Sequence, residues 1–258
     1  MLLVCLTAFF AAGLTLFSGF GLGSILLPAF ALFFPLKAAV AATAVVHLLN
    51  NVFKAGMLGR HARLRVVLVF GLPAMVAAFG GAALLDALSG SQALATWNLG
   101  DRVCPITPDG LVIGGLVGFF ALFELWPRSR EVGFGRGWLS FGGALSGFLG
   151  GLSGHQGALR TAFLIRQGLS KEAFLGTGIL CAILIDVTRI GKYLATESST
   201  DFALIGKQWD LVLGGTLCAL LGSYIGRRLM TKVKMEAIHL LVGVLLAVLG
   251  VAIGVGIV

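Results

Sequence analysis

One stretch of the sequence places polar and charged side chains inside an apolar region. It runs from Phe148 to Arg166, reads FLGGLSGHQGALRTAFLIR, and combines glycines with a histidine, a glutamine and two arginines. A continuous membrane helix has no use for this composition, because lipid tolerates irregular backbone only where protein or a water-filled cavity covers it. The stretch therefore predicts a helix that is broken beside a buried polar cavity.

The spacing within this stretch, Gly154-His155-Gln156-Gly157-x-x-Arg160, indicates an anion-binding site. A helix that begins inside the membrane points unpaired backbone N–H groups and about half a positive charge at the cavity. Glycines let the backbone approach a ligand closely, and Arg160 lies one turn into the predicted helix.

An earlier glycine cluster in the range Thr15–Pro28 has a similar composition. Two broken helix ends that face each other would hold an anion between them. The candidate residues at these ends are Gly21, Gly23, Ser24, Gly154, His155, Gln156, Gly157 and Arg160. For the glycines taken alone, close packing between helices is an equally good explanation.

Four polar residues, His47, Asn50, Asn51 and Lys54, share one face of a helix expected over Leu36–Met57. Their positions i, i+3, i+4 and i+7 lie above one another on a helix. Asn50 and Asn51 could give the anion directional hydrogen bonds, or could belong to a hydrogen-bonded stripe between helices. We expect Lys54 to extend toward the membrane surface.

A later helix carries Asp186, Arg189 and Lys192. Asp186 and Arg189 lie three positions apart, so we expect an ion pair that makes their burial tolerable. Either the pair is only structural, or it holds Arg189 ready for the anion. Lys192 adds a positive charge to the same helix, which also suits an anion.

The composition excludes several classes of protein. Of the 258 residues, 58% are hydrophobic and 12% are charged, whereas soluble domains have about 25% charged residues. We therefore expect an integral membrane protein of the all-α class, with no nucleic-acid partner despite the net charge of +8. We expect no catalytic residues, no metal site and no cofactor, because no nucleophile–base pair or metal-ligand spacing is present.

Ten hydrophobic segments of unequal length follow one another along the chain. A full membrane span needs about 20 apolar residues, and two of the segments have only half that length. The segments are Leu2–Ser18, Ser24–Phe34, Leu36–Met57, Leu64–Leu85, Gly110–Trp126, Trp138–Leu149, Ala158–Gln167, Lys171–Ala195, Gln208–Ile225 and Ala237–Val258. Breaks are expected at the glycines before the two short segments, the second of them over Gly150–Gly157.

The two halves of the chain resemble each other in the order of these segments. A shift of 134 positions places Gly23 on Gly157 and Lys37 on Lys171. The sequence thus predicts a polytopic helical bundle of two repeats, each with a glycine-broken, short or re-entrant half-helix. The predicted ranges are 1–126 for the first repeat, 127–136 for a cytoplasmic linker and 137–258 for the second repeat.

Charge predicts the sides of the membrane. Arginines and lysines gather in the loops Gly59–Arg65, Pro127–Arg136 and Arg227–Lys234, which are therefore expected in the cytoplasm. The loops Asp86–Asp109 and Thr196–Gly206 carry more acid than base and should face outward. Since five segments separate matching points, the second repeat would be inverted relative to the first.

Two motifs give the chain a resemblance to a known family. At Gly19-Phe-Gly-Leu-Gly-Ser-Ile-Leu-Leu-Pro28 and Gly151-Leu-Ser-Gly-His-Gln-Gly-Ala-Leu-Arg160 it resembles the sulfite exporter TauE/SafE family. The second motif departs from the family pattern, because Ala162 stands where Pro28 maps. The resemblance covers almost the whole chain, and it implies transport of sulfite or related oxyanions and organosulfonates across the bacterial inner membrane.

The sequence therefore favours a secondary transporter that exports a small sulfur-containing anion by alternating access. Its partners would be that anion, the lipid bilayer and a coupling proton or cation, and the oligomeric state is open. A passive anion channel with the same site is the main alternative, and a membrane enzyme or assembly factor is a weaker one.

Overall fold

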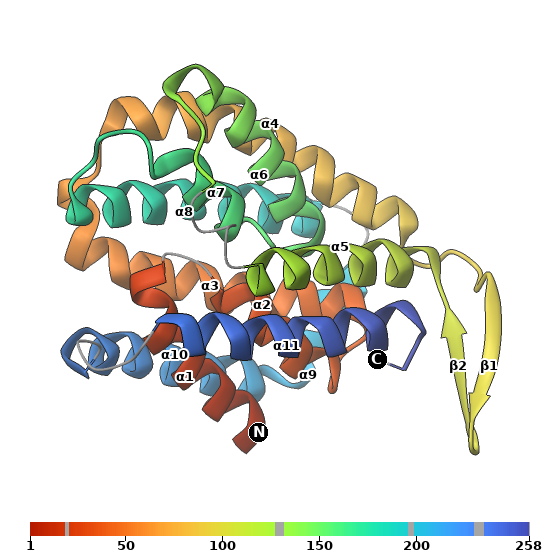
Figure 1. The fold of residues 1–258 in the computed structure, drawn as a ribbon. Helices are drawn as coiled ribbons and strands as arrows, with labels where there is room; N and C mark the ends of the chain where they lie inside the picture. The colour runs from red at the N-terminus through yellow and green to blue at the C-terminus, as the bar shows by residue number, and fades with distance from the viewer. Residues whose placement is uncertain (19–20, 127–131, 196–198, 230–234, 258) are drawn as a thin grey trace.

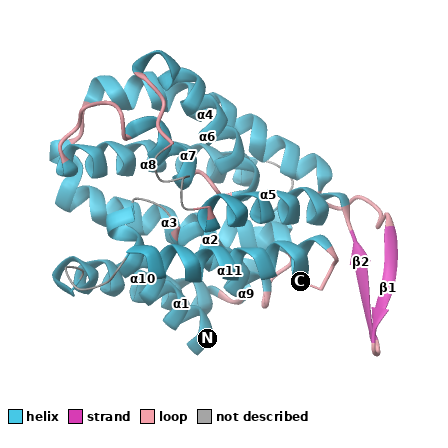
Figure 2. Cartoon of the chain, viewed as in Figure 1, coloured by secondary structure: helices cyan, strands magenta, loops and turns pink. Residues whose placement is uncertain are grey.

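The computed structural model describes residues 1–18, 21–126, 132–195, 199–229 and 235–257. In this part of the chain, regular structure is helical apart from one two-stranded hairpin that projects from the bundle (Figures 1 and 2). Among the described residues, five helices are long and apolar enough to cross a membrane, by length and composition. The predicted all-α polytopic membrane fold is therefore confirmed.

Each of the ten predicted segments is a helix whose ends lie within four residues of the predicted ends. The first half contains α1 (Leu2–Ser18), α2 (Leu22–Ala31), α3 (Leu36–Leu58), a 3-10 turn (Gly59–His61), α4 (Leu64–Leu88), β1 (Ala95–Leu99), β2 (Arg102–Ile106) and α5 (Pro108–Leu125). The second half contains a 3-10 turn (Arg136–Trp138), α6 (Leu139–Ser153), α7 (Gly157–Leu164), α8 (Lys171–Ala195), α9 (Ser199–Lys207), α10 (Trp209–Leu229) and α11 (Met235–Gly254).

The two short helices have the predicted half-length. α2 has 10 residues and α7 has 8, which correspond to about 15 Å and 12 Å of helix. Each can therefore end near the middle of a bilayer whose apolar core is about 30 Å thick. Of the first glycine cluster, Gly19 and Phe20 lie outside the described residues.

The second helix break is shorter than predicted. α6 continues through Gly150 and Gly151 as far as Ser153, and the chain turns only at Gly154. Glycine weakens a helix but does not end it when a neighbouring helix packs closely against it. The turn falls at Gly154 because its left-handed backbone, with φ at 80°, strongly favours a residue without a side chain.

Two loops expected to be irregular contain secondary structure. The polar stretch Asp86–Asp109 forms the β1–β2 hairpin, whose turn uses Gly100 with φ at 62°. Trp97 fastens this hairpin to the bundle, because its indole N–H donates to the carbonyl oxygen of Val255 at 2.7 Å. The predicted loop Thr196–Gly206 contains α9, a helix of nine residues that is too short for a span.

Helices from opposite halves of the chain pack along one another. The main pairs are α1 with α10, α4 with α6, α5 with α11, α4 with α8 and α3 with α8. When the halves are exchanged, α1–α10 becomes α6–α4, whereas α3–α8 and α5–α11 map onto themselves. A two-fold relation between halves produces this pattern. The ranges of the repeats stay predictions, and residues 127–131 of the predicted linker lie outside the described residues.

Glycines bring α4 and α6 into backbone contact. On α6 they recur every fourth residue at Gly143, Gly147 and Gly151, and a Cβ atom on any of them would lie 2.1 Å from a carbonyl oxygen of α4. Gly81 of α4 is equally close to the carbonyl oxygen of Phe148, at 2.0 Å. Small residues allow this approach in membranes, so Gly151 serves helix packing.

Gly147→Ala is expected to push α4 and α6 apart. Overpacking of this kind costs about 1–3 kcal/mol, so the midpoint of thermal unfolding of the purified protein should fall. Gly115→Ala is the matched control, because a Cβ there meets no atom within 4 Å and alanine is the better helix former. Equal midpoints for the two variants would contradict the close α4–α6 contact.

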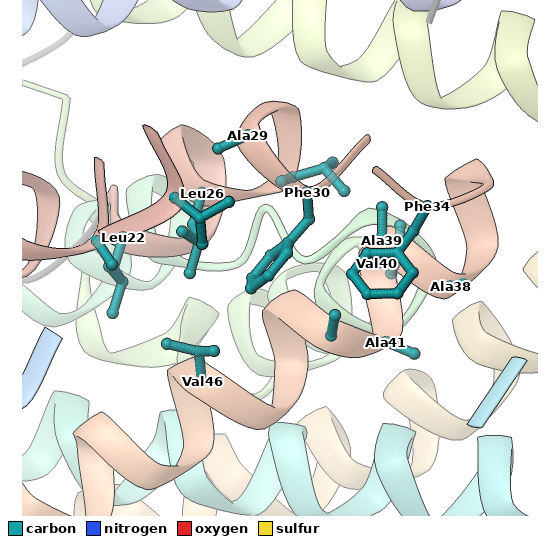
Figure 3. Packing of buried hydrophobic residues seen from close by; sticks show 14 of the residues in the cluster. Leu22, Leu26, Ala29, Phe30, Phe34, Ala38, Ala39, Val40, Ala41 and Val46 are labelled. Carbon is teal, nitrogen blue, oxygen red and sulfur yellow. The ribbon is translucent and has the colours of Figure 1, made fainter. Parts of the chain in front are cut away.

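Apolar packing anchors the first half-helix to α3. Leu22, Leu26 and Phe30 of α2 extend toward Val46 of α3, and all four side chains are buried (Figure 3). The hydrophobic face of α2 therefore fixes the position of its first turn. At that turn, a Cβ on Gly23 would lie 3.3 Å from the carbonyl oxygen of Gly154, so the two helix breaks meet.

Candidate functional site

The broken helix places Gln156 and Arg160 in the interior of the bundle. α7 lies between α6 and α8 (Figure 1). Gly154 closes α6 with an N–H that donates to Gly150 at 2.9 Å, and Arg160 opens α7 with an N–H that donates to Gln156 at 3.1 Å. The exposed fraction is only 1% for Gln156 and 4% for Arg160.

Asp186 of α8 is the hub of the polar interior. Its Oδ1 accepts hydrogen bonds from Arg189 Nε at 3.0 Å and from Gln156 Nε2 at 3.1 Å. Its Oδ2 lies 2.6 Å from His47 Nδ1, across the interface between α3 and α8. The expected Asp186–Arg189 pair is confirmed, and the carboxylate also links α8 to α3 and to the helix break.

Gln156 connects this hub to Arg160, because its Oε1 accepts from Arg160 Nη1 at 3.4 Å. On α3, the side-chain nitrogen of Asn51 lies 3.1 Å from His47 Nδ1. We call these six residues the central cluster: His47, Asn51, Gln156, Arg160, Asp186 and Arg189. His47 and Asn51 lie on α3, more than a hundred positions before the other four, which belong to α8 and to the start of α7 with its N-cap. Every one of the six side chains is buried.

Lys54 lies beside the central cluster, contrary to the prediction that it reaches the membrane surface. It is only 5% exposed, and its Nζ lies 3.0 Å from the side-chain oxygen of Asn50 when that amide is oriented to satisfy its neighbours. In that orientation the Asn50 nitrogen donates to Ser223 Oγ at 2.7 Å. Asn50 thus holds Lys54 and ties α3 to α10.

The buried charges at this site are unequal. Arg160 and Arg189 carry two positive charges, and Lys54 adds a third when it is protonated, whereas Asp186 carries one negative charge. The charge of Arg160 also acts on Lys54. Buried charges are costly unless an opposite charge pairs with them. The central cluster and Lys54 therefore form an environment that favours an added anion.

Three buried polar atoms around the helix break have no hydrogen-bond partner within the described part of the chain: Thr43 Oγ1, His155 Nε2 and Arg189 Nη2. Arg189 Nη2 lies 2.8 Å from Asp186 Oδ1, close enough for an ion pair but poorly aligned for a hydrogen bond. Most buried polar groups in proteins are hydrogen-bonded, so these exceptions mark a place where a polar ligand fits.

Not every predicted residue contacts the central cluster. His155 stacks on Phe120 of α5, with ring centroids 5.5 Å apart, and its Nδ1 faces the Ser153 carbonyl oxygen at 3.0 Å. Gly157 begins α7. Gly21 precedes α2 with φ at 110°, and Ser24 lies in the first turn of α2.

Sequence reasoning missed three partners of the site. His47 was seen only as part of a helical stripe, although it pairs with Asp186. Tyr193 donates from its hydroxyl to the Gly151 carbonyl at 2.6 Å, and Ser223 binds Asn50. The spacing of Tyr193, four residues after Arg189 on the same helical face, is the signal that could have identified it.

Lys192 lies outside the central cluster, so its predicted contribution there is wrong. Its Nζ is 3.3 Å from Asp86 Oδ2, and Lys37 Nζ is 2.5 Å from the other oxygen of the same carboxylate. This ion-pair cluster, Lys37, Asp86 and Lys192, joins the start of α3 to the ends of α4 and α8. Asp86 and Lys192 both lie next to loops that are predicted to face outward.

A basic cavity lies at another part of the bundle. Its volume is about 420 Å³, and Arg63, Arg65 and Arg136 line it together with Gln167. These arginines come from two loops that are both predicted to be cytoplasmic. Gln167 lies seven residues after Arg160, so the segment around α7 connects this basic cavity with the central cluster.

Comparison with known proteins identifies the family. A family model described as sulfite exporter TauE/SafE matches residues 4–253, nearly the whole chain. Searches of curated proteins and of solved structures gave no significant match. Members of the matched family are membrane transporters and not enzymes, in agreement with the helical bundle and its buried polar centre. The chain therefore belongs to the sulfite exporter TauE/SafE family.

Proposed function

We propose that the protein exports sulfite, or a related sulfur oxyanion or organosulfonate, across the bacterial inner membrane by alternating access. The family supports a sulfur anion as the substrate class. The observation that carries the proposal is the surplus of buried positive charge at the helix break, where Arg160 and Arg189, with Lys54 beside them, outnumber Asp186. A bound anion supplies the missing negative charge.

Arg160 is the main counter-charge in this proposal. Its planar guanidinium can donate two parallel hydrogen bonds to an oxyanion. The start of α7 adds backbone N–H groups and the positive end of the helix dipole, with Gly154 and Gly157 allowing a close approach. Arg189 Nη2 offers a further donor. Gln156 is hydrogen-bonded to both Arg160 and Asp186. When an anion binds Arg160 in its place, the hydrogen bond between Gln156 and Arg160 is lost.

The other predicted site residues act around this centre. Gly21, Gly23 and Ser24 form the opposing helix end, since the first turn of α2 meets Gly154. Asn51 and Asn50 orient His47 and Lys54, and so act on the anion through those side chains. His155 offers Nε2, while Phe120 holds its ring.

In the proposed cycle we assign this structure to an occluded state, an assignment supported by the burial of the central cluster, whose residues are at most 9% exposed. Alternating access then requires one end to open at a time. On the predicted outer side, opening would break the contacts of Asp86 with Lys37 and Lys192. On the predicted cytoplasmic side, the basic cavity would attract anions toward Arg160. The exchange symmetry of the helix pairs supports two inverted repeats that move against each other.

Counterflow in proteoliposomes tests the proposal. Labelled sulfite should enter vesicles with saturation, and unlabelled sulfite inside should accelerate its entry, because a carrier returns faster when loaded. Thiosulfate, sulfate and a short organosulfonate, added as competitors, rank the substrate preference. Saturable flux without acceleration by internal sulfite would instead favour a passive anion channel. Absence of flux for every sulfur anion would contradict the proposal.

A further inference from the structure

We propose that His47 and Asp186 form the proton site that couples anion transport to proton movement, an inference that rests on the proposed function. Their contact is short, with His47 Nδ1 2.6 Å from Asp186 Oδ2, and both side chains are buried. Since the ionised carboxylate accepts a hydrogen bond from Nδ1–H, the proton that is gained or lost belongs to His47 Nε2, which lies 3.4 Å from the amide nitrogen of Asn51. Histidine is the side chain whose ordinary titration range covers neutral pH.

The charge of His47 matters for anion binding because other charged side chains surround it. The charges that act on it are those of Asp186, Arg189 and Arg160, and Lys54 lies two helical turns further along α3. The adjacent helices α2 and α6 contain no ionisable side chain, and Asp86 of α4 is held by two lysines. The charged side chains described on α9 and α10 are exposed.

Protonation of His47 therefore adds one positive charge to a site where Arg160 and Arg189 already outnumber Asp186. Without an anion this added charge is opposed by Arg160, Arg189 and, when it is protonated, Lys54. An anion at Arg160 offsets that repulsion, so anion binding favours proton binding and, by reciprocity, a proton favours the anion. Coupling between two binding sites is typically on the order of tenfold.

Gln156 provides the physical connection between the two sites. It donates to the carboxylate that holds His47 and accepts from Arg160. Proton and anion would consequently cross in the same direction. One proton carried with a divalent anion leaves one net negative charge, which a membrane potential negative in the cytoplasm still drives outward.

The test uses purified protein in proteoliposomes with the membrane potential clamped. An inward proton gradient of about one pH unit should drive labelled sulfite to as much as about tenfold accumulation, the limit for one proton per anion. His47→Gln keeps a side chain that can hydrogen-bond to Asp186 but cannot titrate. In this variant we expect the accumulation ratio to fall to about one, while sulfite exchange stays measurable.

Controls separate coupling from transport. His61→Gln alters a histidine in the turn after α3, and it should keep the wild-type accumulation. Sulfite itself is protonated as the pH falls, and this effect is the same for every variant. Measurements on protein-free vesicles, with identical buffers throughout, allow it to be subtracted. If His47→Gln does not fold, Asn51→Leu removes only a neighbour of the His47 ring and should shift the pH dependence of exchange.

The outcomes are distinguishable. Accumulation by His47→Gln at the wild-type ratio overturns the assignment of the proton to His47. If the only variant that folds is Asn51→Leu and its pH dependence is that of the wild type, the assignment fails as well. Sulfite exchange by the wild type without any response to the proton gradient overturns coupling but leaves the proposed export function standing. Absence of sulfite exchange by the wild type rejects the proposed function itself.

Discussion

Arg160→Ala is expected to abolish sulfite binding and transport without unfolding the helical bundle. Hydrogen bonds to charged groups contribute about 1.5–3 kcal/mol each, so losing even one weakens binding by about 13- to 160-fold. The bundle should persist, because the substitution also removes a buried positive charge from a site that holds more positive than negative charge.

Thermal unfolding measures both parts of this prediction. A ligand that binds the folded state raises the unfolding midpoint, so wild-type protein should be stabilised by at least one of sulfite, thiosulfate, sulfate or an organosulfonate. Arg160→Ala should show no such shift, and its midpoint without ligand should stay close to that of the wild type. Counterflow of the same anion should be lost in parallel.

Two further variants test whether the guanidinium itself matters. Arg160→Lys retains the charge but loses the planar pair of donors, and we expect weak binding. Arg166→Ala removes an exposed arginine just after α7 and should bind like the wild type. An undiminished shift in Arg160→Ala would contradict the placement of the anion at α7, and a loss in Arg166→Ala would point to a general effect of charge.

Periodicity and composition predicted the helices well, for physical reasons. Membrane helices need long apolar runs, and glycines interrupt these runs before α2 and α7. The half-length of both helices could therefore be predicted. The extent of the second break could not, because whether Gly150 and Gly151 end a helix depends on the close approach of α4. The β1–β2 hairpin lies in the polar stretch Asp86–Asp109, which was predicted only as a loop.

The site was predictable only where its contacts are local. Asp186 and Arg189 lie three positions apart on one helix, so their spacing predicts the pair. The contact between His47 and Asp186 spans 139 positions, and no helical period specifies it. The positions of two lysines could not be predicted for the same reason. Asn50 holds Lys54 beside the central cluster, whereas Asp86 holds Lys192 away from it.

The largest effect on stability is expected at Asp186. Asp186→Ala would remove the counter-charge of Arg189. The Arg189 side chain is only 1% exposed, so water cannot replace that counter-charge. Removing one partner of a buried ion pair costs about 3–5 kcal/mol. The variant should therefore unfold at a clearly lower temperature than the wild type, with little folded protein at physiological temperature. The measurement is the thermal midpoint of the purified protein in detergent.

The charge explanation can be separated from a simple loss of packing. Asp186→Leu combined with Arg189→Met removes both charges and fills a similar volume, and such replacements of buried ion pairs are often neutral or stabilising. We therefore expect the double variant to be more stable than Asp186→Ala, although it should not couple protons. Asp210→Ala, at an exposed carboxylate in the first turn of α10, controls for loss of negative charge alone. If Asp186→Ala kept the wild-type midpoint, Arg189 would need another counter-charge, and Asp186 would not be the hub that joins α3, α7 and α8.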